Sequence, residues 1–118
     1  MTTTALTTTQ ILLALAFALA GSFKAFRYEL ARERMSWVAA VPRPLVTFIG
    51  VAELLGGIGL LLPWATGVAT FLTPLAAAGL VLTMLLAAGF HLRRRELQAV
   101  PANLVLLCMA AFVSYGRW

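Results

Sequence analysis

The sequence predicts an all-α integral membrane protein, an up-down bundle of four membrane-spanning helices. Of its 118 residues, 62% are hydrophobic and only 11% are charged, and the mean hydropathy is +0.95. A soluble domain of this length would need more polar surface than this composition supplies. Four apolar runs, each close to the ~20 residues that cross a bilayer as a helix, are separated by more polar connectors. Strands are excluded because four of them cannot close a barrel in lipid.

The four spans are expected to form a single domain over residues 1–118. Their approximate limits are 8–26, 44–62, 68–91 and 99–115. No basic residue precedes the first apolar run, so we expect an uncleaved span rather than a signal peptide. Pro44 and Pro101 fall in first helical turns, where a missing N–H does no harm. Pro63 is expected to end the second span, and Pro74 to kink the third.

Positive charge is confined almost entirely to two connectors. Of the nine Lys and Arg residues, all but Arg117 lie at or between the ends of spans one and two, or of spans three and four. The positive-inside rule then predicts a multi-pass protein of the cell inner membrane, with both termini outside and both basic connectors cytoplasmic. Residues 26–35 are expected to form an amphipathic interfacial helix, followed by Trp37 as an interfacial anchor. The sequence lacks the stripe of basic residues that is typical of nucleic-acid-binding proteins, so we expect no nucleic-acid partner.

Glu53 is the residue that most needs an explanation, because it falls in the middle of the second span. An ionisable side chain at mid-bilayer costs about 2.5–3.5 kcal/mol on insertion scales. That cost makes Glu53 the default candidate for a functional group. Cys108 is the sole cysteine, so neither an internal disulfide nor a thiolate metal cluster can form, and we expect no metal site and no cofactor.

Polar residues recur at helical spacing along one face of each span. Gln10 and Lys24 share a face of the first span, and Asn103 and Arg117 share a face of the fourth. Helices in a bundle bury such faces toward one another. We therefore expect an inward polar pocket that opens toward the cytoplasmic side, with Glu53 at its floor.

Depth along the helices selects the residues expected to act with Glu53. Lys24 and His91 lie near the cytoplasmic ends of their spans and are the predicted catalytic partners of Glu53. The residues expected to line the ligand site are Asn103, Gly50, Gly57, Met84 and Phe17. Burial favours a neutral Glu53 that donates a proton, whereas a nearby cation favours an ionised Glu53 that acts as a base or counter-ion; both states remain open.

Simpler interpretations stand beside these roles. Glu53 and Asn103 can instead be explained as hydrogen-bonding links between helices, and Lys24 as a side chain that reaches out to the membrane surface. His91 precedes three arginines at a span end, where an interfacial histidine is common. Glycines of the second span are packing devices in most membrane helices.

Several motifs together resemble the DoxX-like family of small four-span membrane proteins, over nearly the full chain. They are Gly21-Ser-Phe-Lys24, Gly50-x-x-Glu53-x-x-Gly56 with Leu60-Leu-Leu-Pro63, His91-Leu-Arg-Arg, and Tyr115-x-Arg117. The resemblance implies a four-helix membrane fold. It also implies a link to thiosulfate:quinone oxidoreduction, to oxidative-stress complexes or, as in eukaryotic relatives, to receptor assembly.

Three functions follow from this sequence. The first is binding of a lipophilic small molecule, quinone- or isoprenoid-like, at a polar pocket around Glu53, as an accessory subunit of a membrane redox system. The second is an acid–base enzyme, an isomerase, cyclase or epoxide-opening catalyst acting on a terpenoid or other lipophilic substrate. The third is a structural or assembly subunit. Membrane lipids are expected partners, as is a second copy of the chain or a larger membrane complex.

Overall fold

The computed structural model describes residues 2–118, with the backbone alone for Thr2 and Ser36. It contains α1 (Thr2–Phe26), α2 (Tyr28–Arg34), α3 (Arg43–Thr66), α4 (Leu72–Arg93) and α5 (Val100–Arg117), with short 3-10 helices η1 (Ser36–Ala40) and η2 (Leu97–Ala99). Four of these helices, all but α2, are long and apolar enough to cross a membrane. The predicted all-α class of a membrane helical bundle is therefore confirmed.

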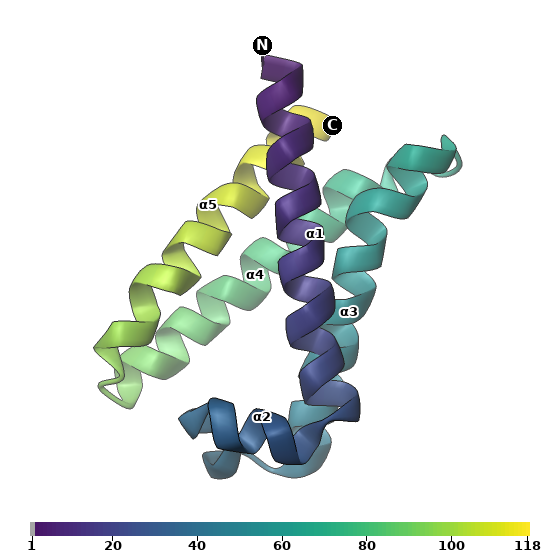
Figure 1. Ribbon diagram of the computed structural model, residues 1–118. Coiled ribbons are helices and arrows are strands. Elements are labelled where there is room, and N and C mark those ends of the chain that lie inside the picture. Colours follow the sequence, from purple (N-terminus) through teal and green to yellow (C-terminus); the bar gives the residue numbers. More distant parts are fainter. Residues whose placement is uncertain (1) are drawn as a thin grey trace.

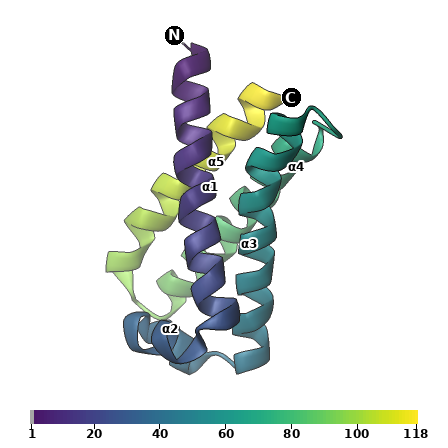
Figure 2. The ribbon, with the colours of Figure 1, turned by 45° about the vertical axis from the view of Figure 1, so that its right-hand side comes forward.

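The four long helices form two antiparallel hairpins, α1 with α3 and α4 with α5 (Figures 1 and 2). The first turn of α1 and the end of α5 lie at one end of the molecule, here called the terminal end. α2, η1 and the connector between α4 and α5 lie at the opposite end, here called the connector end (Figure 1). The two hairpins meet toward the terminal end and diverge toward the connector end.

The main core fills the junction between the two hairpins. Leu13 and Phe17 of α1 pack there with Leu60 of α3, Leu80 of α4 and Val113 of α5, all nearly inaccessible to solvent. Large apolar side chains on the outer faces are exposed instead. Outward apolar faces are what helices surrounded by hydrocarbon require.

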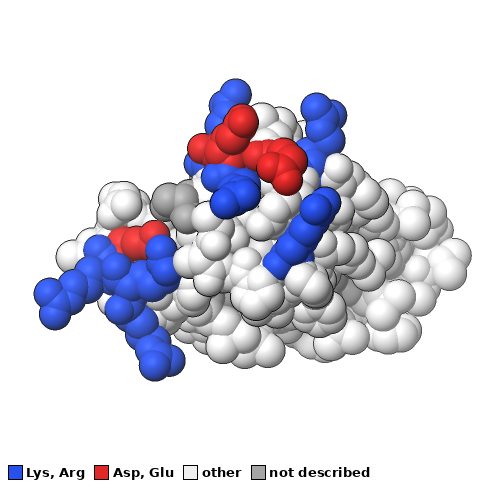
Figure 3. All heavy atoms as spheres, turned by 90° about the horizontal axis from the view of Figure 1, so that it is seen from below, with Lys and Arg blue, Asp and Glu red and all other residues white. Residues whose placement is uncertain are grey.

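The chain leaves the membrane-length helix α1 at Arg27, whose backbone is not helical, and α2 then runs across the connector end (Figure 1). A second small core holds this segment in place, in which Ala31 and Val38 pack on Val46 of α3. Figure 3, which views the molecule from the connector end, shows Lys, Arg and Glu side chains gathered on that face. The expected amphipathic helix is thus present as a separate helix with one apolar side.

Both proline expectations in the middle of the chain were wrong. Pro63 lies inside α3, which continues to Thr66 and ends where Gly67 adopts a left-handed conformation (φ 73°) and donates its N–H to the Pro63 carbonyl at 3.0 Å. This is a common way to end a helix, and glycine adopts it without steric cost. Pro74 lies in the first turn of α4, where it interrupts no helical hydrogen bond. Neither proline therefore has the predicted position: Pro63 is interior to α3 rather than at its end, and Pro74 belongs to the first turn of α4 rather than its interior.

Candidate functional site

Lys24 and Glu53 form a buried ion pair between α1 and α3. The Lys24 Nζ donates to Glu53 Oε1 at 2.5 Å, and the two residues are only 8% and 3% exposed. Lys24 therefore does not extend to the membrane surface, and that simpler interpretation was wrong. Each charge compensates the other in surroundings where an isolated charge would be costly.

Glycines make this ion pair possible because they let α1 and α3 come into backbone contact. A Cβ added to Gly21 would lie 2.5 Å from the Gly50 carbonyl oxygen, and one added to Gly50 would lie 2.6 Å from the Ala25 nitrogen. A Cβ on Gly57 would lie 2.9 Å from the Ala14 carbonyl oxygen. Close approach through small residues is typical of membrane helix pairs. Gly50 and Gly57 thus face α1, and their predicted contact with a ligand stays a prediction.

Trp37 of η1 joins the ion pair to the second hairpin. Its ring centroid lies 5.3 Å from Lys24 Nζ, within the range of a cation–π contact. The same ring packs edge-on against Phe90 and His91 of α4, with centroid distances of 6.2 and 6.4 Å. The sequence indicated only an interfacial anchor at Trp37. Nothing in its local pattern predicts that it bridges two hairpins.

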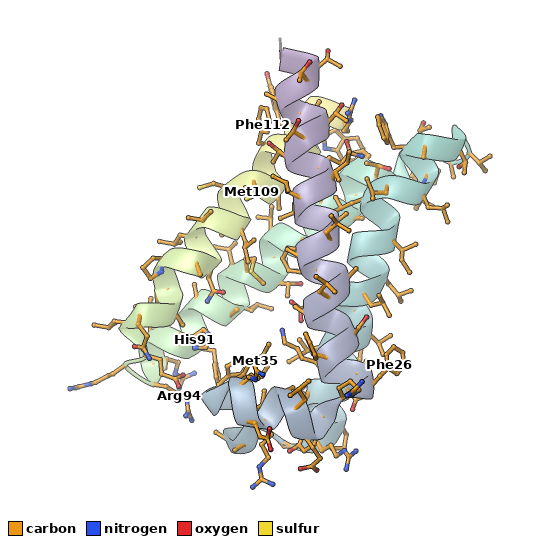
Figure 4. The ribbon with its side chains drawn as sticks, in the orientation of Figure 1. Phe26, Met35, His91, Arg94, Met109 and Phe112 are labelled. Carbon is orange, nitrogen blue, oxygen red and sulfur yellow. The ribbon has the colours of Figure 1, made fainter. Side chains whose placement is uncertain are left out.

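His91 belongs to a separate polar cluster with Glu96 and Arg94. Its Nδ1 lies 3.1 Å from Glu96 Oε1, which also accepts from Arg94 Nε at 2.9 Å. The hydrogen bond from Arg94, and then that from His91, holds the pKa of Glu96 below its usual value. In Figure 4, His91 and Arg94 lie at the connector end of α4, and Met35 lies between them and the Phe26 end of α1. The structure therefore brings Lys24 to Glu53 but gives His91 another carboxylate.

The remaining predicted site residues lie apart from Glu53. Phe17 and Met84 are buried in the main core. Asn103 lies in the first turn of α5, and its buried Nδ2 has no hydrogen-bond partner among the described residues. The same holds for Thr73 Oγ1 near the start of α4. A buried amide donor without a partner is costly, so Asn103 retains an unused capacity for a ligand or a water.

Two surface grooves between described helices lie away from Glu53. One, of about 320 Å³, runs between α1 and α3 and is lined by apolar side chains such as Leu15 and Ile58. The other, of about 350 Å³, lies between α4 and α5 beside Ser114 and Tyr115. The expected polar pocket around Glu53 therefore stays a prediction. In this structure the Lys24 ammonium donates to Oε1 of the Glu53 carboxylate.

A third polar cluster, at the terminal end, was not anticipated as a unit. Gln10, which is fully buried, donates through Nε2 to the Leu60 carbonyl of α3 and accepts through Oε1 from Arg117 Nε of α5 at 2.7 Å. Arg117 Nη2 also donates to Thr7 Oγ1 at 3.0 Å, and its guanidinium lies 4.9 Å from the Trp64 ring centroid. The polar faces of spans one and four were the available signal, because each already contained one member of the pair.

Four apolar helices in two hairpins, with a buried ion pair between the first two long helices, define a small multi-pass integral membrane protein. The family model described as the DoxX-like family matches residues 8–113, and the chain belongs to that family. No curated protein and no solved structure matched the chain. Among the described residues, no three His, Cys, Asp or Glu side chains gather closely enough to hold a metal ion.

Proposed function

We propose that the protein binds the oxygen-bearing head of a lipophilic small molecule, quinone- or isoprenoid-like, at the Lys24–Glu53 pair, as an accessory subunit of a membrane redox system. The observation that carries the proposal is the unused hydrogen-bonding capacity of this buried pair. A lysine ammonium has three N–H donors, and within the described part of the chain only Glu53 accepts from Lys24. On Glu53, Oε1 is the one oxygen that accepts a hydrogen bond from a described residue.

The pair suits a head group that alternates between carbonyl and hydroxyl. An oxidised quinone presents carbonyl oxygens, which accept from the Lys24 ammonium. The reduced form presents hydroxyl groups, which donate to the Glu53 carboxylate. A carboxylate and an ammonium side by side therefore recognise both redox forms of the same head, while the apolar helix faces accommodate the tail.

We also propose an orientation for the protein in the membrane. In the cell inner membrane, the positive-inside rule places both termini outside and the arginine-rich connector end in the cytoplasm. Lys24 lies in the last turn of α1, close to the connector end. A head group bound there would exchange protons or electrons with partners on the cytoplasmic side. Trp37, whose ring contacts Lys24, would lie beside this head group.

A structural role in holding α1 to α3 is the second candidate, and the glycine contacts favour it. The backbone approach at Gly21 and Gly50 shows that this helix pair is closely packed at the level of the ion pair. The acid–base enzyme has no comparable support, because no contact among the described residues joins His91 to Glu53. It remains a hypothesis without an observation of its own.

A double variant separates binding from structure. Replacing both partners of a buried ion pair by apolar residues is often neutral or stabilising, whereas removing one partner is strongly destabilising. Lys24→Met combined with Glu53→Leu should therefore remain folded but lose the polar site. Equilibrium dialysis in detergent micelles with a decyl-substituted benzoquinone, its hydroquinone and farnesol measures retention.

We expect the folded double variant to bind the preferred probe about 10–100-fold more weakly than the natural protein, since each charge-assisted hydrogen bond contributes about 1.5–3 kcal/mol. Glu33→Gln is the matched control, because it neutralises an exposed carboxylate on α2 and should leave retention unchanged. Equal retention by the natural protein and the folded double variant would exclude the binding site and leave the structural role.

A further inference from the structure

Arg117, in the last turn of α5, is held in a defined position by neutral groups. Gln10 accepts from its Nε at 2.7 Å, Thr7 accepts from its Nη2 at 3.0 Å, and the Trp64 ring lies against the guanidinium plane with a centroid distance of 4.9 Å. These three contacts come from two helices, α1 and α3, and orient the Arg117 side chain. None of them neutralises its positive charge.

The chain has no side-chain carboxylate to spare for Arg117. Its four acidic residues are all glutamates. Glu29 and Glu33 lie on α2 at the connector end, Glu53 pairs with Lys24, and Glu96 accepts from Arg94. Arg117 is the last residue of α5, and that end of α5 lies at the opposite, terminal end (Figure 1). The positive charge of Arg117 therefore has to be compensated by a group other than a glutamate side chain of this chain.

The position of Arg117 along the helices indicates what that counter-charge is. It lies at the end of an apolar, membrane-length helix, beside Trp64 and next to Trp118, which is 73% exposed, and near Tyr115, which is 86% exposed. Tryptophan and tyrosine gather where membrane helices meet the lipid head groups. At such an interface the guanidinium would lie level with the lipid phosphodiester groups.

The donor arrangement fits a phosphate. A guanidinium has five N–H donors in a planar fork, and the two contacts to Gln10 and Thr7 leave donors unused. Arginine pairs with phosphate oxygens through parallel hydrogen bonds, and the planar group stacks on aromatic rings at the same time. We propose that Arg117, with Trp64 and Thr7, forms a binding site for the phosphate of an anionic phospholipid at the terminal end of the bundle.

Gln10 has a positioning role in this site. It is fully buried and fixed to the α3 backbone, so it sets the orientation of the guanidinium rather than contacting the lipid. The site is independent of the Lys24–Glu53 pair and lies at the other end of α1. The ligand of this site is the phospholipid, which is bound through its phosphate group. Comparison with a soluble phosphate ester distinguishes binding of the lipid from binding of phosphate alone.

Native mass spectrometry of the protein in neutral detergent tests the proposal. The natural protein and Arg117→Gln are titrated separately with phosphatidylglycerol, phosphatidylcholine and glycerol 3-phosphate, and occupancy of the tightest site is measured. We expect phosphatidylglycerol to bind at least about tenfold more weakly to Arg117→Gln, because a charge-assisted bidentate contact is lost. Phosphatidylcholine should bind weakly to both proteins, since its own cation satisfies its phosphate.

Two further variants complete the test. Arg117→Lys keeps the charge but loses the fork, so it should retain intermediate affinity even if Arg117→Gln is poorly folded. Arg32→Gln removes the same charge from α2 and should bind phosphatidylglycerol like the natural protein. The proposal is overturned if Arg117→Gln binds phosphatidylglycerol normally, if Arg32→Gln weakens binding equally, or if glycerol 3-phosphate binds as tightly as the lipid.

Discussion

Near each end of α1, a buried polar side chain of α1 forms a hydrogen bond to α3, but the charge is neutralised within the chain at only one of the two ends. At the connector end, Lys24 reaches from α1 to Glu53 of α3, and positive and negative charge meet within the chain. At the terminal end, Gln10 reaches from the same face to the backbone of α3 and also holds Arg117 of α5. One end thus joins two helices through a neutralised pair, and the other joins three helices around a charge that stays unneutralised.

The difference shows how a small membrane bundle can combine fixed packing with an external contact. A neutral amide accepts and donates at once, so Gln10 can link two helices to its own without adding a charge. An ammonium only donates, so Lys24 needs an acceptor, and a carboxylate satisfies both its charge and its hydrogen bond. Changing one group at each end should therefore have unequal consequences.

The largest effect is expected from separating the ion pair. Lys24→Met alone leaves Glu53 buried without its partner and should lower the free energy of unfolding by about 3–5 kcal/mol. Adding Glu53→Leu should recover most of that loss. Unfolding followed by circular dichroism in mixed micelles gives both values. A Lys24→Met protein as stable as the natural one would show that the pair contributes little, and the contrast between the ends would disappear.

Glycine substitutions sharpen the comparison at the level of packing. A Cβ on Gly21 meets backbone atoms of α3 at 2.5 and 2.6 Å, which cannot move aside, so Gly21→Ala should destabilise by about 1–3 kcal/mol. A Cβ on Gly116 meets only the end of the flexible Leu6 side chain at 2.7 Å, so Gly116→Ala should cost clearly less. Gly89→Ala, with nothing within 4 Å, serves as the control and should stabilise by up to about 1 kcal/mol. Equal losses at Gly21 and Gly116 would contradict the difference in rigidity.

Gln10→Leu tests the neutral link at the terminal end. The change removes the acceptor of Arg117 Nε and the donor to Leu60, and we expect a loss of about 1–3 kcal/mol, smaller than that from breaking the ion pair. The same unfolding measurement applies. Thr7→Ala removes one contact to Arg117 and should cost less than Gln10→Leu. A larger loss from Thr7→Ala than from Gln10→Leu would reverse the assigned roles.

The smallest effect is a pH dependence at the connector end. Hydrogen bonds from Arg94 and then His91 lower the pKa of Glu96, so the folded protein holds its ionised form more strongly than the unfolded chain does. The resulting stabilisation is present above the usual glutamate pKa and is lost as the pH falls through the lowered value. A carbon-13 titration of the Glu96 carboxyl should show a midpoint below the usual glutamate pKa. In Arg94→Gln the midpoint should rise, and an unchanged midpoint would exclude the Arg94 contact as the main cause.

The sequence predicted the helical membrane class because apolar runs of bilayer length leave few alternatives. It also placed Lys24 and Glu53 on inward faces, since a mid-span charge must avoid hydrocarbon. It named both Lys24 and His91 as partners of Glu53 and did not single out Lys24, because the contact depends on how closely glycines let α1 and α3 approach. The pairing of Gln10 with Arg117, and the bridging position of Trp37, depend on the angle between the hairpins, which no local pattern encodes.

The order of the two charges along the chain has a consequence for biosynthesis. Lys24 precedes Glu53 by 29 residues, so the ribosome delivers the cation to the membrane before its counter-ion exists. Lys24 lies in the last turn of α1, from which a long side chain can remain in contact with water while translation continues. Glu53, in the interior of α3, cannot reach water in this way, but Lys24 has already been synthesised when Glu53 enters the membrane. Because the lysine precedes the glutamate in the chain, both groups can lose their bound water at the moment when they form the ion pair.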